Sequence, residues 1–224
     1  MITSLLAEFP GFAVHYDPAQ KPYFEATLVA DLRLLASKTL GAALLKAIDD
    51  ARPVSRTPTV NSAKGIVFPV GANVMCLPTS MDFIPSGSKL VGAYDAQGKF
   101  GATGLDATPD PRFNPAGCRF YAKGGSYAEA GDPTKSSNGG TVSLMHYTNA
   151  QIFSQGAGDR EIAYPHIVLA HELIHCLHHL LGNQLSTGMK DEELRTTGLS
   201  KWTFEKFSEN QFRRAFHLEL RNSY

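Results

Sequence analysis

The sequence contains little cysteine, and its three thiols show no spacing pattern. Cys76, Cys118 and Cys176 are an odd number in a chain of 224 residues, so they do not suggest the paired framework of a small disulfide-rich domain. Free thiols are typical of a protein that works in a reducing cytosol. The class of secreted scaffolds that depend on disulfides for stability is therefore excluded.

The sequence also lacks an excess of charge and any long apolar run. Lysine plus arginine equals aspartate plus glutamate at 21 each, so no net charge draws the chain to nucleic acid or acidic membranes, which leaves room only for a small basic patch. No stretch reaches the roughly 18 apolar residues of a membrane span. The N-terminal MITSLLAEFPGF has neither the basic region nor the apolar core of a signal peptide. We expect a soluble protein without nucleic-acid or membrane partners.

The composition is that of one globular domain, with 43% hydrophobic and 19% charged residues, and we expect a single core over residues 1–224. Residues 24–51 repeat leucine and isoleucine at helical spacing, with a break near residues 37–41. Residues 52–149 contain short β-prone runs separated by glycine, proline, asparagine and serine. The strands are expected at residues 66–70, 73–77, 89–94, 118–122 and 141–147, the first two forming a hairpin across Gly71.

These elements predict an α+β fold with a twisted, mostly antiparallel sheet. Residues 101–140 are rich in glycine, proline, aspartate and serine, and we interpret them as long surface loops of the same domain. The aromatic residues between positions 202 and 216 have charged residues between them, which favours an amphipathic C-terminal helix that closes the core. Nucleotide-binding patterns such as G-x-G-x-x-G and the P-loop are absent.

The strongest pattern is HELIHCLHHL at residues 171–180. On a helix, His171 and His175 lie one turn apart on the same face, so both imidazoles can reach one metal ion. Glu172 points to the side, toward a water molecule on that ion. This H-E-x-x-H arrangement is typical of zinc hydrolases, in which two histidines hold Zn²⁺ and the glutamate takes a proton from the bound water.

The residues around this motif favour an ordered helix. Pro165 suits its first turn and Gly182 suits its end, and the apolar residues between them are enough to bury it. Cys176 points about 100° away from His175 on a helix and is expected to pack in the core. The alternative is a core helix whose histidines are only hydrogen-bonded.

A catalytic zinc site needs a third protein ligand and an open position for water. His178 lies seven residues beyond His171, a rise of roughly 10 Å, so we interpret His178 and His179 as neighbours of the site or solvent-facing groups. The next acidic cluster, residues 191–193, follows a glycine-containing loop that allows the chain to fold back. A glutamate from this cluster as third ligand makes a glutamate-type zincin.

The same residues resemble those of a known family. HELIH followed by EELRT at residues 192–196 is similar to the zinc motif and EELRT segment of the clostridial neurotoxin light chains, although the interval between the motifs is shorter here. The resemblance implies that Glu193 binds zinc and that Glu192 is its neighbour. It also implies that Arg221 and Tyr224, in the terminal RNSY, stabilise the oxyanion of the reaction.

The length, the stretch PHIVLAHELIHCLH and the RNSY ending more closely resemble the NleD-like effector metallopeptidases of bacterial pathogens. This resemblance implies a zinc endopeptidase that acts as a secreted effector or toxin, exported by a specialised secretion system without a signal peptide. It also implies host proteins as substrates in the host cytosol, with MAP kinases of the JNK and p38 type as examples. We expect a monomer with one zinc ion.

Further residues complete the predicted site. Residues 141–147 are expected to form an edge strand that binds a substrate peptide as an added strand; its substrate-binding residues are Thr141, Val142, Ser143 and Leu144. Glu192 and Arg195 are expected to orient the zinc ligands by hydrogen bonds. The alternative is that Glu192 pairs with Lys190 or Arg195 at the surface.

Two other classes of function remain open. One is an inactive or structural-zinc module that binds a host protein without cleaving it. A structural site is closed by four protein ligands, usually including thiolates, and the cysteines here lack paired spacing. The other is a zinc hydrolase that acts on something other than peptide bonds, because the motif alone does not identify the bond.

Overall fold

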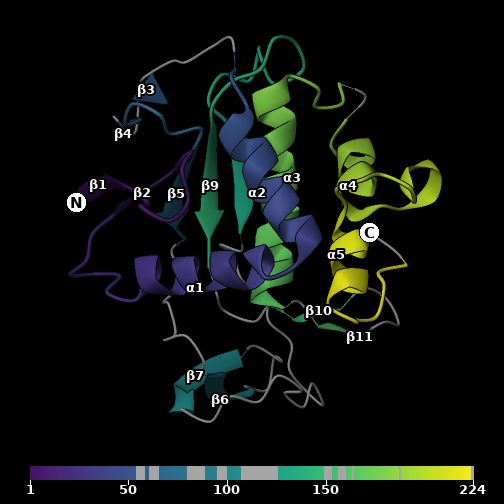
Figure 1. The fold of residues 1–224 in the computed structure, drawn as a ribbon. Helices are drawn as coiled ribbons and strands as arrows, with labels where there is room; N and C mark the ends of the chain where they lie inside the picture. Colours follow the sequence, from purple (N-terminus) through teal and green to yellow (C-terminus); the bar gives the residue numbers. More distant parts are fainter. Residues whose placement is uncertain are drawn as a thin grey trace.

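The fold is a mixed α+β arrangement in which an open sheet is packed against helices (Figure 1). The structure, a computed structural model, describes residues 1–53, 59–60, 66–79, 89–94, 100–106, 126–148, 153–155, 160–162, 164–186 and 188–222. Among these residues, no helix combines the length and the apolar character that crossing a bilayer requires.

In the described part of the chain, the central sheet has five strands in the order β1-β2-β5-β9-β8. These strands are β1 (Ile2–Leu5), β2 (Phe12–Tyr16), β5 (Val74–Pro78), β8 (Tyr127–Ala130) and β9 (Ser143–Tyr147). The two inner pairings, β2–β5 and β5–β9, are parallel, whereas β1–β2 and β9–β8 are antiparallel. The prediction of a mostly antiparallel sheet is therefore wrong for this sheet, which is mixed.

Three smaller antiparallel pairs accompany this sheet. They are β3 (Thr59–Val60) with β4 (Ile66–Val67), β6 (Lys89–Tyr94) with β7 (Phe100–Asp106), and β10 (Phe153–Gln155) with β11 (Arg160–Ile162). The strand predicted at residues 89–94 is confirmed, whereas the one at 118–122 lies outside the described residues. The predicted hairpin across Gly71 is wrong, because β4 pairs with β3 and β5 enters the sheet between β2 and β9.

The predicted N-terminal helix and its break are confirmed as α1 (Phe24–Ala36) and α2 (Thr39–Asp50). The turn between the two helices is tight: a Cβ at Gly41 would lie 1.9 Å from the carbonyl oxygen of Leu35. Only glycine permits this approach. The buried faces of both helices join β2, β5 and β9 in the main hydrophobic core.

A polar pair links α1 to the inner strand β9. The Tyr147 hydroxyl donates a hydrogen bond to the carboxylate of Asp31. Burial raises the pKa of Asp31 to about 6, although the bond from Tyr147 acts in the opposite direction. Folding therefore favours the protonated form of Asp31.

The helix that carries the H-E-x-x-H motif is α3 (Pro165–Leu181), and it begins and ends as predicted. Pro165 occupies its first turn, and Gly182 ends it in the left-handed conformation with φ of 64°. Gly140, with φ of 79°, lies against the same end: a Cβ there would be 2.1 Å from the carbonyl oxygen of Leu180. The Thr141 amide donates to the His179 carbonyl at 2.9 Å, so the start of the β9 segment is fastened to the end of α3.

The C-terminal part contains α4 (Met189–Thr197), the 3₁₀ helix η1 (Ser200–Trp202) and α5 (Glu209–Ala215). The prediction of one amphipathic helix over residues 202–216 is wrong. Ser200 has φ of 54°, in the left-handed region, and after the short 3₁₀ helix η1 the chain forms turns and bends up to Phe207. Phe212 is fully buried, whereas Phe204 is 93% exposed, so these aromatic residues do not share one buried face.

Candidate active site

Three metal-binding side chains converge from α3 and α4. The Nε2 atoms of His171 and His175, one turn apart on α3, lie 3.2 Å from each other. The carboxylate of Glu193, on α4, reaches both: Oε2 lies 3.1 Å from His171 Nε2, and Oε1 lies 3.2 Å from His175 Nε2. The structure thus brings together the two predicted histidines and the predicted third ligand.

The spacing of these donors fits a zinc ion. Tetrahedral bonds of about 2.0–2.1 Å place neighbouring ligand atoms roughly 3.3 Å apart, and the three observed separations are 3.1 to 3.2 Å. His171, His175 and Glu193 also form one of two groups of donor atoms, among the described residues, that lie close enough together to hold an ion. The donor set of two imidazoles and one carboxylate is that of a catalytic rather than a structural zinc site.

The electrostatics of the cluster favour a cation between the three side chains. Burial opposes protonation of His171, but its hydrogen bonds to Glu193 and Glu209 outweigh burial and raise its pKa to about 10. Burial acts to raise the pKa of Glu193, but the hydrogen bonds from His171 and His175 dominate and hold that pKa well below its usual range. A site that stabilises positive charge to this extent suits a divalent metal ion, which would take the place of the proton.

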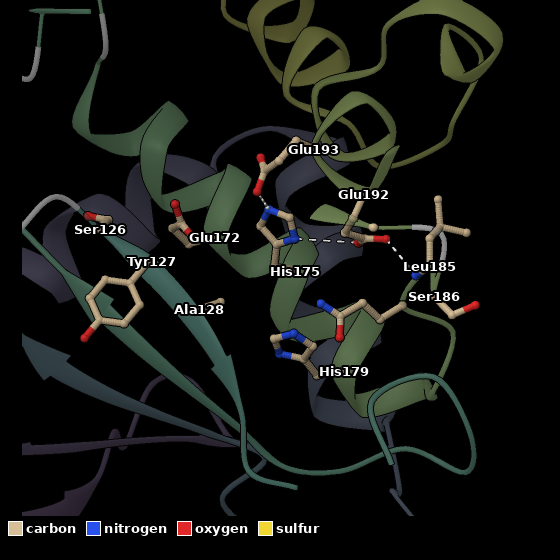
Figure 2. A pocket seen from close by; sticks show the side chains of 12 residues that line it. Ser126, Tyr127, Ala128, Glu172, His175, His179, Leu185, Ser186, Glu192 and Glu193 are labelled. Atoms are coloured by element: carbon tan, nitrogen blue, oxygen red, sulfur yellow. Dashed lines mark hydrogen bonds and ion pairs between the residues drawn. The ribbon is translucent and has the colours of Figure 1, made fainter. Parts of the chain in front are cut away.

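Glu172 lies in the wall of a pocket that opens beside these ligands. The pocket has a volume of about 600 Å³ and is lined on one side by residues of the β8 segment and on the other by the loop between α3 and α4. Figure 2 shows Glu172 facing Tyr127 and Ser126, with Leu185 and Ser186 beyond His175 on the opposite side. Burial raises the pKa of Glu172, against the effect of His171 and His175, and a carboxylate whose pKa is raised is a better proton acceptor.

Glu209, on α5, hydrogen-bonds His171 on the side away from the metal-binding Nε2, and no sequence pattern predicted this contact. Its Oε2 lies 3.0 Å from His171 Nδ1, so His171 donates from Nδ1 and keeps Nε2 for the metal. Arg213 donates to the same carboxylate at 2.7 Å, and Arg221 at 3.1 Å. Burial acts to raise the pKa of Glu209, but the hydrogen bond from His171 and the two arginines lower it to about 2. No local pattern links Glu209 to a motif 38 residues away.

The Nδ1 atom of His175 lies 3.4 Å from the Thr196 hydroxyl, and Glu192 lies nearby. Glu192 is buried, hydrogen-bonds His178 Nδ1, and has Oε1 3.6 Å from His175 Nδ1. Its second oxygen accepts a hydrogen bond from the Leu185 amide at 2.9 Å, which connects the loop between α3 and α4 to α4. The alternative of a surface pair with Lys190 or Arg195 does not fit this buried position.

The remaining predicted residues are distributed as follows. His178 and His179 are both buried rather than solvent-facing, and His179 Nδ1 lies 2.9 Å from the Ser143 hydroxyl. Arg195 bonds Glu205 at 3.2 Å and the Asn183 carbonyl at 2.9 Å, so its hydrogen bonds do not go to the zinc ligands. Arg221 reaches the site through Glu209, whereas Tyr224 lies outside the described residues.

The prediction that residues 141–147 form an edge strand is wrong. Strand β9 pairs with β5 on one side and β8 on the other, so its backbone groups are already used within the sheet. The four predicted substrate-binding residues are also buried; they are Thr141, Val142, Ser143 and Leu144. The edge that faces the pocket belongs instead to β8.

The hydrogen-bond pattern shows which backbone groups of β8 face outward. The Gly131 amide donates to the Val142 carbonyl at 2.8 Å, while the Ser143 amide turns to the opposite side and donates to Asn73 at 3.0 Å. Because antiparallel partners alternate between bonded and non-bonded positions, Tyr127 and Glu129 face β9, and Ala128 and Ala130 face away from it. Among the described strands, β8 ends the order of its sheet, so the N–H and C=O of Ala128 point toward the pocket side.

The fold is similar to that of two structures of a Clostridium botulinum toxin. One is the catalytic domain of neurotoxin serotype F, with a TM-score of 0.52 and 15% identity over 93% of this chain and 68% of that chain. The other is a structure of the serotype F light chain, with a TM-score of 0.50 and 14% identity over 93% of this chain and 69% of that one. No family model matches the chain, and no curated protein matches it in sequence. At such identities the likeness establishes a shared fold, that of the clostridial neurotoxin light chains.

Proposed function

We propose that this protein is a zinc-dependent endopeptidase. The observation that carries the proposal is the convergence of three side chains, with both Nε2 atoms 3.1 to 3.2 Å from a Glu193 oxygen and 3.2 Å from each other, at a pocket that Glu172 also lines. A fold shared with a neurotoxin catalytic domain and the resemblance of the HELIH and EELRT segments to the light chains support the same activity.

The residues around the pocket have distinct tasks in this reaction. His171, His175 and Glu193 would hold one Zn²⁺, which when bound lowers the pKa of a water molecule and polarises the scissile carbonyl. Glu172 takes the proton of the attacking water and delivers it to the leaving amine. Glu209 and Thr196 hydrogen-bond the Nδ1 atoms of His171 and His175, which keeps the two imidazoles in the orientation that presents Nε2.

The substrate is proposed to lie along β8 as an extended strand. Ala128 offers one N–H and one C=O on the side away from β9, and it lines the pocket together with Glu172 and His175. A peptide that pairs with Ala128 crosses the pocket next to the ligands. This replaces the role that the sequence suggested for residues 141–144.

Arg221 and Tyr224 are proposed to stabilise the oxyanion, as the resemblance implies. The support from the structure concerns Arg221 alone: Glu209 holds its guanidinium at 3.1 Å, and Asn210 bonds its backbone N–H at 2.8 Å and its carbonyl at 2.9 Å. These contacts keep Arg221 next to Glu209, which in turn bonds the proposed zinc ligand His171. A cationic donor in that region favours developing negative charge.

The finer part of the proposal concerns biology. The PHIVLAHELIHCLH stretch and the RNSY ending support a bacterial effector or toxin, exported by a specialised system, that cleaves host proteins in the cytosol. MAP kinases of the JNK and p38 type are the first substrates to test. A non-cleaving module with a structural zinc would need a fourth protein ligand, whereas each of the two donor groups found among the described residues has three members.

The test compares the wild-type chain with Glu172→Gln in host-cell lysate, using mass spectrometry to find new peptide ends. New ends are expected only with the wild type, and both proteins are expected to bind one zinc per chain. Chelation of zinc should abolish the new ends. Cleavage that persists in Glu172→Gln or after chelation would overturn the proposal.

A further inference from the structure

A short surface segment carries an aromatic side chain that the fold does not use. Phe204 is 93% exposed, although large apolar residues normally lie inside. It belongs to residues 199–207, which we call the aromatic knob. Figure 1 shows this segment projecting from the side of α4, away from the sheet.

The aromatic knob is a series of tight turns held in place at its base. The Trp202 amide donates to the Leu199 carbonyl at 3.0 Å, and the Glu205 amide donates to the Trp202 carbonyl at 2.9 Å. Arg195, on α4, bonds Glu205 at 3.2 Å and lies over the Trp202 ring, 5.6 Å from its centroid. Phe204 is therefore presented at the surface by an anchored turn.

The charge of the knob is positive. Arg195 neutralises Glu205, the acidic residue of the segment. Lys201 and Lys206 are exposed and lie over aromatic rings, 5.1 Å from the centroid of Trp202 and 4.8 Å from that of Phe207. No carboxylate in the described part of the chain forms an ion pair with either lysine, so two cations flank Phe204.

We propose that the aromatic knob binds the surface of membranes that contain anionic lipids, with Phe204 entering the interface and the two lysines contacting headgroups. Aromatic rings with flanking cations are suited to that interface, and each lysine near an anionic leaflet adds favourable energy. One exposed ring is too little for a stable protein interface, which buries about 800 Å² on each partner. Lys201 and Lys206 thus form a small basic patch, which is compatible with a net charge of zero for the whole chain.

The aromatic knob is joined to the helix that carries Glu193, so membrane binding would also orient the pocket. Helix α4 carries Glu193 and ends at Thr197, and the knob begins two residues later. Arg195 ties the knob back to the same helix. A membrane-bound molecule would therefore hold its pocket at a fixed orientation to the lipid surface.

The experiment is co-sedimentation of the purified full chain with vesicles of phosphatidylcholine, with and without phosphatidylserine. We expect binding only when phosphatidylserine is present, and weaker binding as salt is added. Phe204→Ala should weaken binding by roughly tenfold or more. Lys201→Gln and Lys206→Gln should each weaken it by about fivefold.

Two control proteins make the result specific. Val70→Ala changes a residue that is 96% exposed in a turn outside the knob, and it should bind vesicles as the wild type does. Glu172→Gln should also bind unchanged, so the result is independent of whether the protein is a peptidase. No binding to either vesicle, equal binding to both, or full binding by Phe204→Ala would overturn the proposal. Capture of a protein through Phe204 without vesicle binding would also overturn it.

Discussion

Replacing Glu209 with glutamine should weaken zinc binding although Glu209 does not touch the metal position. Oε1 accepts the bond from Arg213, and Oε2 accepts those from His171 and Arg221. Glutamine has one oxygen, so in either orientation its amide N–H₂ faces at least one donor. The negative charge that holds His171 and offsets two arginines is also lost.

The expected loss of zinc affinity follows from the hydrogen bonds that Glu209→Gln changes. If the amide oxygen stays on the side of His171, the bond to the imidazole survives without its charge; if the amide turns, the bond is lost altogether. Groups that orient a metal ligand contribute roughly 10-fold to 100-fold in metal affinity, or about 1.4–2.7 kcal/mol. We expect the zinc dissociation constant of Glu209→Gln to rise within that range.

The assay is a zinc titration against a competing chromophoric chelator, with circular dichroism to confirm folding. Glu8→Gln is the matched control, because Glu8 pairs with Arg33 at the exposed surface and should bind zinc as the wild type does. A folded Glu209→Gln protein with unchanged zinc affinity would refute the argument that Glu209 positions His171. An equal loss in Glu8→Gln would show that the effect is not specific to the site.

Three other changes test separate parts of the structure. Glu193→Gln should release zinc, whereas Glu192→Gln should retain it with weaker affinity; metal analysis that gives the opposite order would reverse the assignment of the ligand. Ala128→Pro removes an outward N–H and should lower kcat/KM about threefold to tenfold without changing zinc content, whereas Ala128→Gly keeps the N–H and should leave kcat/KM unchanged. Equal kcat/KM in the two variants would argue against substrate pairing at β8. Burial raises the pKa of Asp31 from its ordinary 3.8 to about 6, so the free energy of unfolding should fall as the pH rises from 4 to 6 and the buried carboxyl loses its proton. Above pH 6, Asp31→Asn should be more stable than the wild type by about 2–3 kcal/mol in urea unfolding. A wild-type free energy of unfolding that does not change between pH 4 and 7 would contradict this.

The parts of the fold that depend on nearby residues could be predicted from the sequence. The apolar period of residues 24–51 and the break before Gly41 gave α1 and α2, and Pro165 and Gly182 gave the limits of α3. The i, i+4 spacing of His171 and His175 is likewise a local property of a helix. Glu193 depended on a resemblance, because the spacing alone did not choose between neighbouring acidic residues.

The parts that depend on distant pairing could not be predicted in this way. Strand β9 reads as a short β-prone run, and its pattern does not say whether it lies at the edge or inside the sheet; its position between β5 and β8 is set by residues 74–78 and 127–130. Glu209 is an isolated carboxylate until α5 packs against α3. The aromatic residues near the C-terminus looked like one helical face, but Ser200 and the Arg195–Glu205 pair direct the chain into turns.

The contact of Gly140 with the end of α3 has a consequence for genetics. A Cβ at Gly140 would meet the Leu180 carbonyl at 2.1 Å, and one at Gly182 would meet the Gly140 nitrogen at 2.3 Å, so even alanine at either position must push the helix and the strand apart. A random screen for loss of activity should therefore recover substitutions at these two glycines as often as at the histidines. Such alleles would be null although neither position reaches the metal or the substrate.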